Sequence, residues 1–314
     1  MFPQSLWPTM ATLVLSILVG AEGYAASVGW GSPPAAAKSA TTPSNLQLKR
    51  MDRATTSSLQ IMLDPVTVTE KSMLVPSGKD QPLKIGFARE VPQPYQDDLS
   101  SWLSWKSLSD GTQVAAFSVS SPDAQAIRVG IDVADLPEAA EIRIFGSKNS
   151  ESFGPFTVKS IRAQPTGGGT NSTESAATLF WSPVIEGETA EVEIGLPASV
   201  ESGFSIRVPK IQHLAYSLQY PNEKRLSEIG ESGSCNIDIK CRDTVPSDLS
   251  AAVAKIIFSD NQATYVCTGT LLNDNDSSSW IPYLITANHC LSNQTVANTI
   301  DSYWFFERAI CGGP

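Results

Sequence analysis

The sequence is poor in cysteine and histidine, and the few copies are unevenly placed. All five cysteines lie between Cys235 and Cys311, so any disulfide bonds belong to that last part of the chain. Because five is an odd number, at least one thiol has no partner inside this sequence. Only two histidines are present, and no two cysteines have the C-x-x-C spacing, which argues against a bound metal. We therefore expect no metal site and no cofactor.

The chain also lacks a positive net charge and a long apolar run. Its 32 acidic residues outnumber its 22 basic ones, which argues against nucleic acid as a partner because phosphate backbones attract basic surfaces. The apolar run Met10–Gly20 is too short for a membrane-spanning helix, which needs about 20 residues. Followed by Ala21–Ala26, with the small residues Ala25 and Ala26 as a cleavage site, it is typical of a secretory signal peptide. We expect residues 1–26 to be that peptide, with an uncleaved membrane anchor as the alternative. After cleavage the product is expected to be a secreted or periplasmic monomer without stable membrane association.

Composition divides the remaining chain into four parts. Residues 27–80 are rich in small and polar residues and are expected to be a low-complexity leader. Residues 81–220 contain short alternating segments separated by turn residues, which predict an antiparallel β-sandwich. Residues 221–234 form a polar connector and a candidate processing region. Residues 235–314 contain further strand-like segments, which predict the opening strands of a small antiparallel barrel.

The predicted strands are short segments rich in apolar residues, and several in the first β-rich part alternate polar and apolar residues as a half-buried strand does. In the first β-rich part they are Gln113–Val119, Ala126–Val133, Glu141–Gly146, Ala190–Ile194 and Phe204–Val208. In the last part they are Val253–Phe258, Tyr265–Leu272, Trp280–Ala287 and Tyr303–Phe306, with a hairpin turn at Asn273–Asp276. Few segments have helical spacing, so the fold class is expected to be all-β.

One histidine stands where catalysis could use it. His289 comes just after an apolar strand and directly before Cys290, and Cys267 begins a small-residue strand 22 residues earlier. A neutral imidazole can take up a proton at neutral pH and return it. A histidine that merely lies beside a structural disulfide explains the same spacing, and the residues alone leave both interpretations open. The other histidine, His213, follows the last sandwich strand and is expected to be structural.

Three motifs, taken in order, resemble a known family. They are Gly233–Cys241 (GSCNIDIKC), Cys267–Gly269 (CTG) and Thr286–Cys290 (TANHC). Together they resemble the start of the mature chain of bacterial lysyl endopeptidases, which are secreted serine proteases of the chymotrypsin-like fold. The upstream sandwich resembles the pro-regions of such precursors. The resemblance implies an antiparallel β-sandwich pro-region followed by the N-terminal part of a chymotrypsin-like double β-barrel.

The resemblance also implies roles for single residues. His289 would be the general base of a serine protease, acting on protein or peptide substrates, with lysine before the cleaved bond as the family's preference. Two bridges and one cysteine whose partner lies outside this sequence are implied as well: Cys267–Cys290, Cys241–Cys311 and Cys235.

Two parts of the family's catalytic machinery are not found in the sequence. The orienting aspartate and the Gly-x-Ser-Gly-Gly nucleophile segment should follow the histidine, yet no Gly-Asp-Ser-Gly or Gly-Ser-Ser-Gly segment is present. Asp301 follows His289 too closely to orient it, and Ser234 is not in a nucleophile context. We therefore expect an exported serine endopeptidase precursor that is truncated after its first catalytic residue and is inactive as given.

Other interpretations of the function of this chain remain open. The main alternative is a non-catalytic secreted β-sandwich binding module joined to a protease remnant, and in a third reading the sandwich binds carbohydrate. Half of a double barrel would expose an apolar face and open strand edges near Tyr303–Phe306. We therefore expect the last 80 residues, expressed alone, to be prone to aggregation or loosely ordered.

Overall fold

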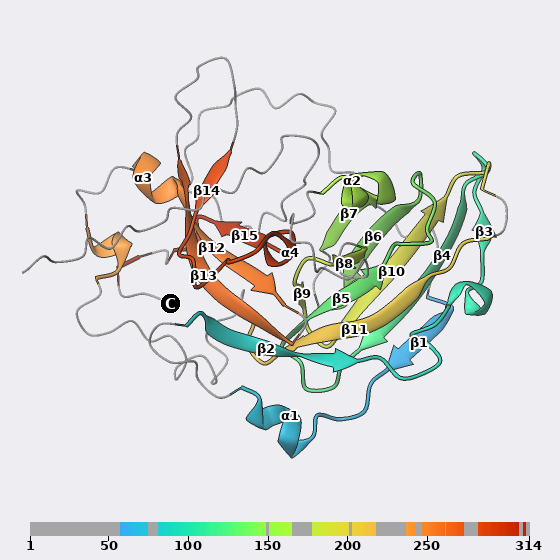
Figure 1. The fold of residues 1–314 in the computed structure, drawn as a ribbon, viewed down its shortest axis with the longest axis horizontal. Helices are drawn as coiled ribbons and strands as arrows, with labels where there is room; N and C mark the ends of the chain where they lie inside the picture. Colours follow the sequence, from blue (N-terminus) through green and yellow to red (C-terminus); the bar gives the residue numbers. More distant parts are fainter. Residues whose placement is uncertain are drawn as a thin grey trace, which may run out of the picture.

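The structure is a computed structural model that describes ten stretches of the chain: residues 57–74, 81–148, 151–164, 178–200, 203–217, 237–242, 247–260, 262–272, 282–307 and 310–311. The predicted signal peptide, the connector, Cys235 and the turn at Asn273–Asp276 lie outside these residues. Strands dominate the described part, which confirms the all-β prediction (Figure 1).

The strands form two sheets, and every pairing is antiparallel except that of β1 with β4. The smaller sheet has the order β1-β4-β10-β6-β7, with β3 beside β4. Its strands are β1 (Leu59–Met62), β3 (Lys106–Ser107), β4 (Gln113–Ser120), β6 (Glu141–Gly146), β7 (Ser152–Thr157) and β10 (Thr189–Leu196).

The larger sheet has the order β15-β12-β13-β2-β11-β5-β8, with β14 beside β13 and β9 beside β5. Five of its strands belong to the first β-rich part: β2 (Leu83–Glu90), β5 (Ala126–Asp132), β8 (Leu179–Trp181), β9 (Ile185–Glu186) and β11 (Arg207–Leu214). The other four come from the last part: β12 (Val253–Ser259), β13 (Ala263–Leu272), β14 (Tyr283–Ile285) and β15 (Asp301–Trp304).

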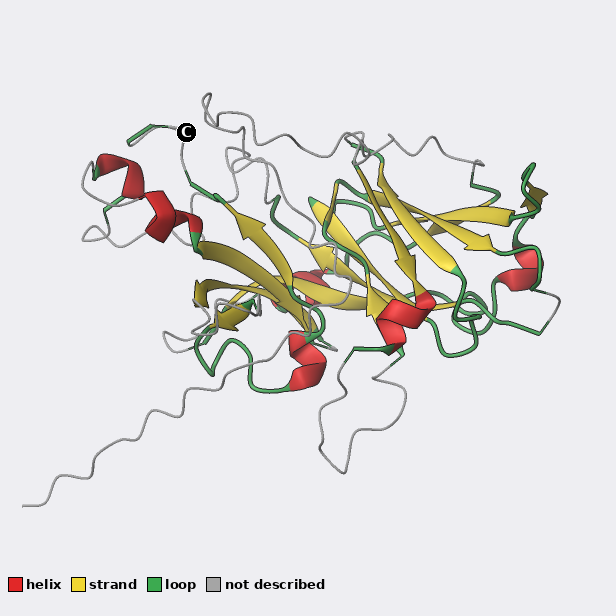
Figure 2. Cartoon of the chain, turned by 90° about the horizontal axis from the view of Figure 1, so that it is seen from above, coloured by secondary structure: helices red, strands yellow, loops and turns green. Residues whose placement is uncertain are grey.

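The helices are short and lie at the margins of the sheets (Figure 2). They are α1 (Val68–Ser72), α2 (Val158–Arg162), α3 (Ser247–Ala251) and α4 (Gln294–Ala297), with 3₁₀ turns η1 (Ser100–Trp102) and η3 (Ile239–Cys241). Within the described stretches, no helix combines the length and the apolar character that crossing a membrane requires.

The main core lies between the two sheets of the sandwich. Phe117 of β4, Ile131 of β5 and Ile194 of β10 are fully buried in it, as members of one large apolar cluster. Complete burial of a side chain of this size contributes about 1.5–3 kcal/mol. The alternation that predicted these strands is therefore the packing of one strand face into this core.

The sandwich begins earlier in the chain than the alternation indicated. Residues 59–72 fall within the predicted low-complexity leader, yet they form β1 and α1. β1 buries only Ile61 before the chain continues to the buried Leu63, which is too short an alternation to stand out in the sequence. The Thr67–Glu70 capping box, in which each side chain bonds the other residue's backbone amide, was a readable helix-start signal.

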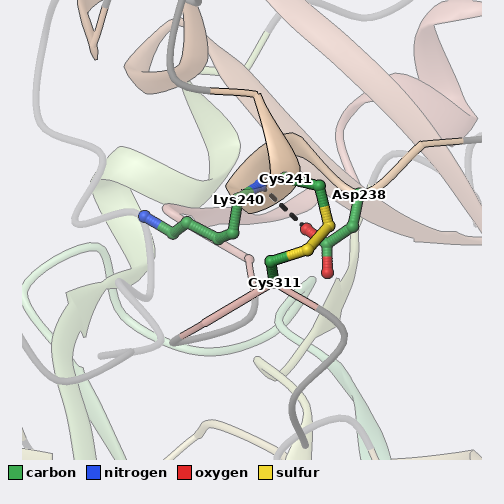
Figure 3. Close-up of a disulfide and its surroundings, with 4 residues drawn as sticks. All are labelled: Asp238, Lys240, Cys241 and Cys311. Carbon is green, nitrogen blue, oxygen red and sulfur yellow. Dashed lines mark hydrogen bonds between the residues drawn. A yellow bond between two sulfur atoms is a disulfide. The ribbon is translucent and has the colours of Figure 1, made fainter.

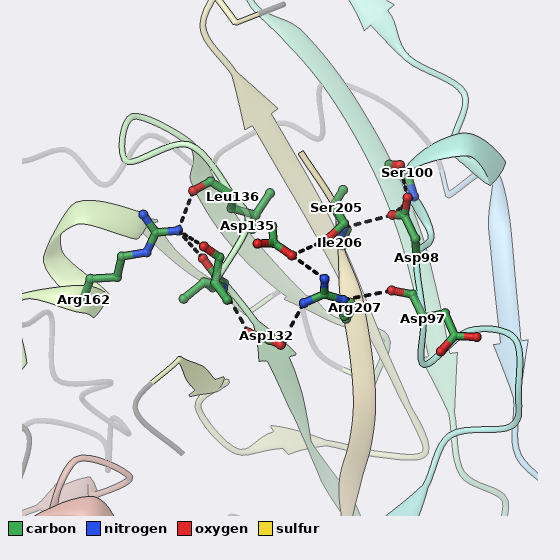
Figure 4. A network of polar contacts seen from close by, with 12 residues as sticks. Asp97, Asp98, Ser100, Asp132, Asp135, Leu136, Arg162, Ser205, Ile206 and Arg207 are labelled. Atoms are coloured by element: carbon green, nitrogen blue, oxygen red, sulfur yellow. Dashed lines mark hydrogen bonds and ion pairs between the residues drawn. The ribbon is translucent and has the colours of Figure 1, made fainter. Parts of the chain in front are cut away.

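A polar network fastens one end of the sandwich (Figure 4). Arg207, at the start of β11, pairs with the carboxylates of Asp132 and Asp135. Asp98 accepts hydrogen bonds from the backbone amides of Ser100 and Ile206, at 2.9 and 3.1 Å. Burial works against the charged form of Asp98, but these hydrogen bonds outweigh it and lower the pKa of the carboxyl. The network ties the η1 turn to the neighbouring ends of β5 and β11.

One sheet runs through both β-rich parts of the chain. The sequence suggested a sandwich followed by a separate partial barrel, whereas β13 pairs with β2 over residues 263–266. Strands β12 to β15 form a curled antiparallel sheet beside the sandwich (Figure 1), as in the opening strands of a chymotrypsin-like barrel. The division of the chain into separate domains stays a prediction.

Candidate active site

His289 lies in the turn that follows β14. Residues 288–290 form this turn, in which the Cys290 amide donates to the Ala287 carbonyl at 2.9 Å. Just before it, the Thr286 hydroxyl donates to the Thr268 carbonyl of β13 at 2.8 Å. The turn is therefore fixed to the neighbouring strand, and the His289 side chain is exposed to solvent.

A disulfide holds the same turn from the other side. Cys290 is bonded to Cys267 of β13, with 6.3 Å between the two Cα atoms. Cys290 is buried against Ile256 and Phe258 of β12 in a small apolar cluster. The bridge implied by the family resemblance is thus formed, and it anchors the backbone next to His289 in packed structure.

The imidazole and the bridge are close neighbours, but they do not make a metal site. A ring nitrogen of His289 and the Sγ atoms of Cys267 and Cys290 all lie within 4.8 Å of one another. Zinc and related metals bind thiolates, and these two sulfur atoms are instead bonded to each other. The sulfur atoms are therefore near the His289 ring because the disulfide holds the turn that carries His289.

The second implied bridge, Cys241–Cys311, closes the segment on itself (Figure 3). It joins the η3 turn to a residue 70 positions later, with 4.6 Å between the Cα atoms. Beside it, the Asp238 carboxylate accepts a hydrogen bond from the Lys240 amide at 2.9 Å and caps the turn. Strands β12 to β15 thus lie inside one covalently closed loop.

Asp301 does not serve His289. Its carboxylate is buried and accepts hydrogen bonds from the Val184 amide at 3.0 Å and the Tyr303 hydroxyl at 3.2 Å. Burial raises the pKa of this carboxyl, against the opposing charge of Arg128. Among the described residues, the His289 imidazole has no hydrogen-bond partner. The described stretches therefore position a base without the acid and the alcohol that a triad needs.

The structure also contains a serine–histidine pair that the sequence did not reveal. The Ser121 hydroxyl lies 2.8 Å from Nδ1 of His213, and Nη1 of Arg89 donates to the same hydroxyl at 2.9 Å. Because the guanidinium can only donate, the hydroxyl's own proton points to Nδ1, and we assign the remaining imidazole proton to Nε2. Ser121 and His213 are 92 residues apart in the chain, so no short sequence motif predicts that they form a pair.

This pair is structural. Ser121 is fully buried and His213 is 4% exposed, so no substrate can reach them. His213 stacks on Phe87 with 4.9 Å between ring centroids. Burial, assisted by the charge of Arg89, lowers the pKa of His213 to about 4. Arg89 also pairs with Glu70 of α1 at 2.9 Å. Ser121, His213 and Arg89 therefore connect α1 to the sandwich, which agrees with the structural role expected for His213.

Comparison with known families agrees with the two β-rich parts. The lysyl endopeptidase N-terminal domain matches residues 62–215, and the lysyl endopeptidase C-terminal domain matches residues 229–314, which include His289 and both bridges. The chain belongs to the lysyl endopeptidase family. A lysyl endopeptidase of Pseudomonas aeruginosa is 31% identical over 243 residues, which cover 74% of this chain and 48% of that protein.

The lysyl endopeptidase match concerns only part of the relative. The chain spans about half the length of the curated relative it matches. No solved structure is significantly similar to this chain. Family membership supports a protease, and the roles of single residues rest on the geometry described above.

Proposed function

We propose that this chain is the front portion of an exported serine endopeptidase that cleaves peptide bonds after lysine, with His289 as its general base. The observation that carries the proposal is the exposed imidazole on a bridge-anchored strand end, inside the segment that matches the lysyl endopeptidase C-terminal domain.

In the proposed peptide hydrolysis, His289 must be correctly positioned and must have a ring nitrogen that can accept a proton. A serine hydroxyl supplied by the complete enzyme would give its proton to the His289 imidazole while its oxygen attacks the carbonyl carbon of the scissile bond. The imidazolium would then return the proton to the leaving amine. The Cys267–Cys290 bridge and the hydrogen bond from Thr286 to Thr268 hold the turn, so that little reorganisation accompanies these transfers.

We further propose that these 314 residues do not hydrolyse peptides by themselves. Asp301 is committed to the Val184 amide and the Tyr303 hydroxyl, and Ser121 is sealed in the core. The nucleophile, the orienting carboxylate and the oxyanion hole would come from sequence outside these residues. Export is supported by the signal-like N-terminus and by two disulfides, which persist in oxidising compartments.

The test uses the product of the whole open reading frame, read through the codon for Pro314 to its stop. We expect this product to release the leaving group from a lysyl anilide at least about 100-fold faster, in kcat/KM, than from a leucyl anilide, because a site built to bind the lysine ammonium would leave its polar groups unpaired with an apolar side chain. We expect the 314-residue chain to show no turnover above the buffer rate.

The outcomes separate the proposed enzyme from its alternative. A reading frame that encodes a Gly-x-Ser-Gly segment and lysine-selective hydrolysis supports the endopeptidase. A stop codon directly after Pro314, with no hydrolysis by the purified protein, instead supports the non-catalytic binding module, for which the buried core of the sandwich provides a scaffold. Hydrolysis without preference for lysine refutes the proposed specificity.

A further inference from the structure

A short helix at the margin of the sandwich carries an exposed lysyl bond. In α1, Lys71 is followed by Ser72, and both residues are exposed. The helix has five residues, none of them buried, and it lies apart from the sheets, below β2 in the view of Figure 1. A protease binds its substrate in an extended form, so it cuts bonds where the backbone can open locally. Opening α1 would expose no apolar core.

The contacts that hold α1 to the sandwich are polar. On one side of the bond, the Glu70 carboxylate pairs with Arg89 of β2 at 2.9 Å. On the other side, Nζ of Lys84, also in β2, donates to the Met73 carbonyl at 3.2 Å. The helix start depends on the Thr67 side chain, which caps the Glu70 amide at 3.2 Å in an exposed position. Since such exposed polar contacts contribute little each, α1 can open while the sheets stay intact.

A second helical lysine provides a comparison within the same chain. Lys159 is also exposed, also lies in a five-residue helix, α2, and is also followed by a serine, Ser160. Unlike α1, however, α2 buries Val158 and Ile161 in the main core. Opening α2 would expose both side chains to water, which is unfavourable. The Lys159–Ser160 bond should therefore resist a protease that cuts Lys71–Ser72.

The other lysyl bonds whose two residues the structure describes lie in paired strands or beside a disulfide. Lys106, in the two-residue strand β3, is exposed but is paired with Val114 of β4. The rest follow Lys84 of β2, Lys210 of β11, Lys255 of β12 and Lys240, which lies next to the Cys241–Cys311 bridge. A strand must leave its sheet and lose its backbone hydrogen bonds before a protease can bind it. These bonds should therefore be cut more slowly than Lys71–Ser72.

We propose that Lys71–Ser72 is a processing site, the first of these bonds to be cut by a lysine-specific endopeptidase. The inference rests on the proposed function, because the complete enzyme would have this specificity and one copy could cut another. In the cut, the Lys71 carbonyl carbon gains the hydroxyl of a water molecule, the C–N bond breaks, and the Ser72 nitrogen takes the remaining hydrogen. No cysteine precedes Cys235, so β1 and its buried Ile61 would then be held to the sandwich by noncovalent contacts alone.

The experiment is limited proteolysis of the 314-residue chain by a purified lysine-specific endopeptidase, with each cut bond identified by mass spectrometry over time. The parent protein carries arginine at the lysines whose bonds lie outside the described residues, through K38R, K49R, K79R, K148R and K224R. We expect the Lys71–Ser72 bond to be cut first, at least about tenfold faster than Lys159–Ser160, because the rate follows the population of the locally open state. K71R should abolish this first cut.

Two matched cap variants test whether opening of the helix controls the cut. T67A removes the cap of α1 and should speed cutting at Lys71–Ser72 by about threefold or more, because loss of a cap favours the open helix. T157A removes the equivalent cap of α2, where the Thr157 hydroxyl accepts from the Ser160 amide at 3.2 Å. The Lys159–Ser160 bond should still be cut slowly in T157A, since the buried side chains continue to hold α2.

Three results would overturn the processing site. One is a first cut at Lys106–Ser107 or Lys159–Ser160, and another is an unchanged rate at Lys71–Ser72 in T67A. The third is a complete enzyme that hydrolyses the lysyl anilide but leaves Lys71–Ser72 intact. If the complete enzyme does not hydrolyse the lysyl anilide while the added endopeptidase still cuts at Lys71 first, the proposed function fails and the accessibility of this bond stands, so the two failures are distinguishable.

Discussion

Acid should destabilise the sandwich through His213, and the size of the effect follows from its surroundings. The folded protein lowers the pKa of His213 from 6.5 to about 4, mainly through burial. A histidine with a depressed folded-state pKa favours the native state above its unfolded pKa, and this contribution is lost as the pH falls from about 6.5 toward 4. A shift of this size corresponds to about 3.4 kcal/mol at full protonation, of which about 2.5 kcal/mol should be lost between pH 7.5 and pH 4.5.

The perturbation that isolates this effect is His213→Gln, since glutamine offers the Ser121 hydroxyl an acceptor but does not titrate. Urea denaturation of both proteins at pH 7.5 and 4.5 gives the free energy of unfolding. Acidic groups such as Asp301 titrate in both proteins, so the difference between their pH dependences reports His213. We expect wild type to lose about 2.5 kcal/mol more than the variant. As a control, S121A should lower stability at pH 7.5 by about 1 kcal/mol and keep the pH dependence. Equal losses in wild type and His213→Gln would refute the reasoning.

Three further predictions concern stability. Replacing Cys267 and Cys290 together by alanine should cost about 3 kcal/mol in urea denaturation, since the bridge closes a loop of 23 residues; a loss below about 1 kcal/mol would contradict the anchoring role. Gly86→Ala should lower the Tm by several degrees, because an added Cβ would lie 2.6 Å from the His213 carbonyl oxygen, and an unchanged Tm would show that the strands can separate at no cost. Residues 235–314 expressed alone should scatter light on concentration, because Phe305–Phe306 are about half exposed; a sharp cooperative melt would contradict this.

The strands that could be predicted are those with one face in the core. Glu141–Gly146 was predicted with the bounds that β6 has, because its buried and less buried positions alternate through its first half. β11 begins at Arg207, three residues after the predicted start at Phe204, because the segment before it is irregular. Of the predicted strand Trp280–Ala287, the structure describes the part from residue 282 onward, and within that part Tyr283–Ile285 pair with β13 as β14.

Contacts between distant segments could not be predicted. Arg128 lies in a strand whose alternation is typical of a half-buried strand with polar residues toward solvent, yet its side chain is buried and donates to Ser259 and Thr299 of the C-terminal segment. The pairing of β2 with β13 joins residues about 180 positions apart, and their local patterns do not specify a partner. Local sequence patterns likewise do not predict the contact between Ser121 and His213.

The surroundings of the candidate site, in contrast to these long-range contacts, could be predicted, because short sequence motifs indicate them. The neighbourhood of His289, Cys267 and Cys290 follows from local spacing and family resemblance, and the structure brings these three residues together. The acid and the alcohol could not be located, because the Asp301 carboxylate is used elsewhere and no group in the described stretches forms a hydrogen bond with the imidazole.

The most direct test of the account is kcat/KM for a lysyl peptide, measured on the product of the whole reading frame and on two variants at neighbouring exposed positions, His289→Gln and Asn288→Ala. If His289 is the general base, its replacement should reduce kcat by about 10⁴-fold or more with little change in KM, while Asn288→Ala stays within a few-fold of wild type. A His289→Gln enzyme that keeps activity within tenfold of wild type would contradict the assignment.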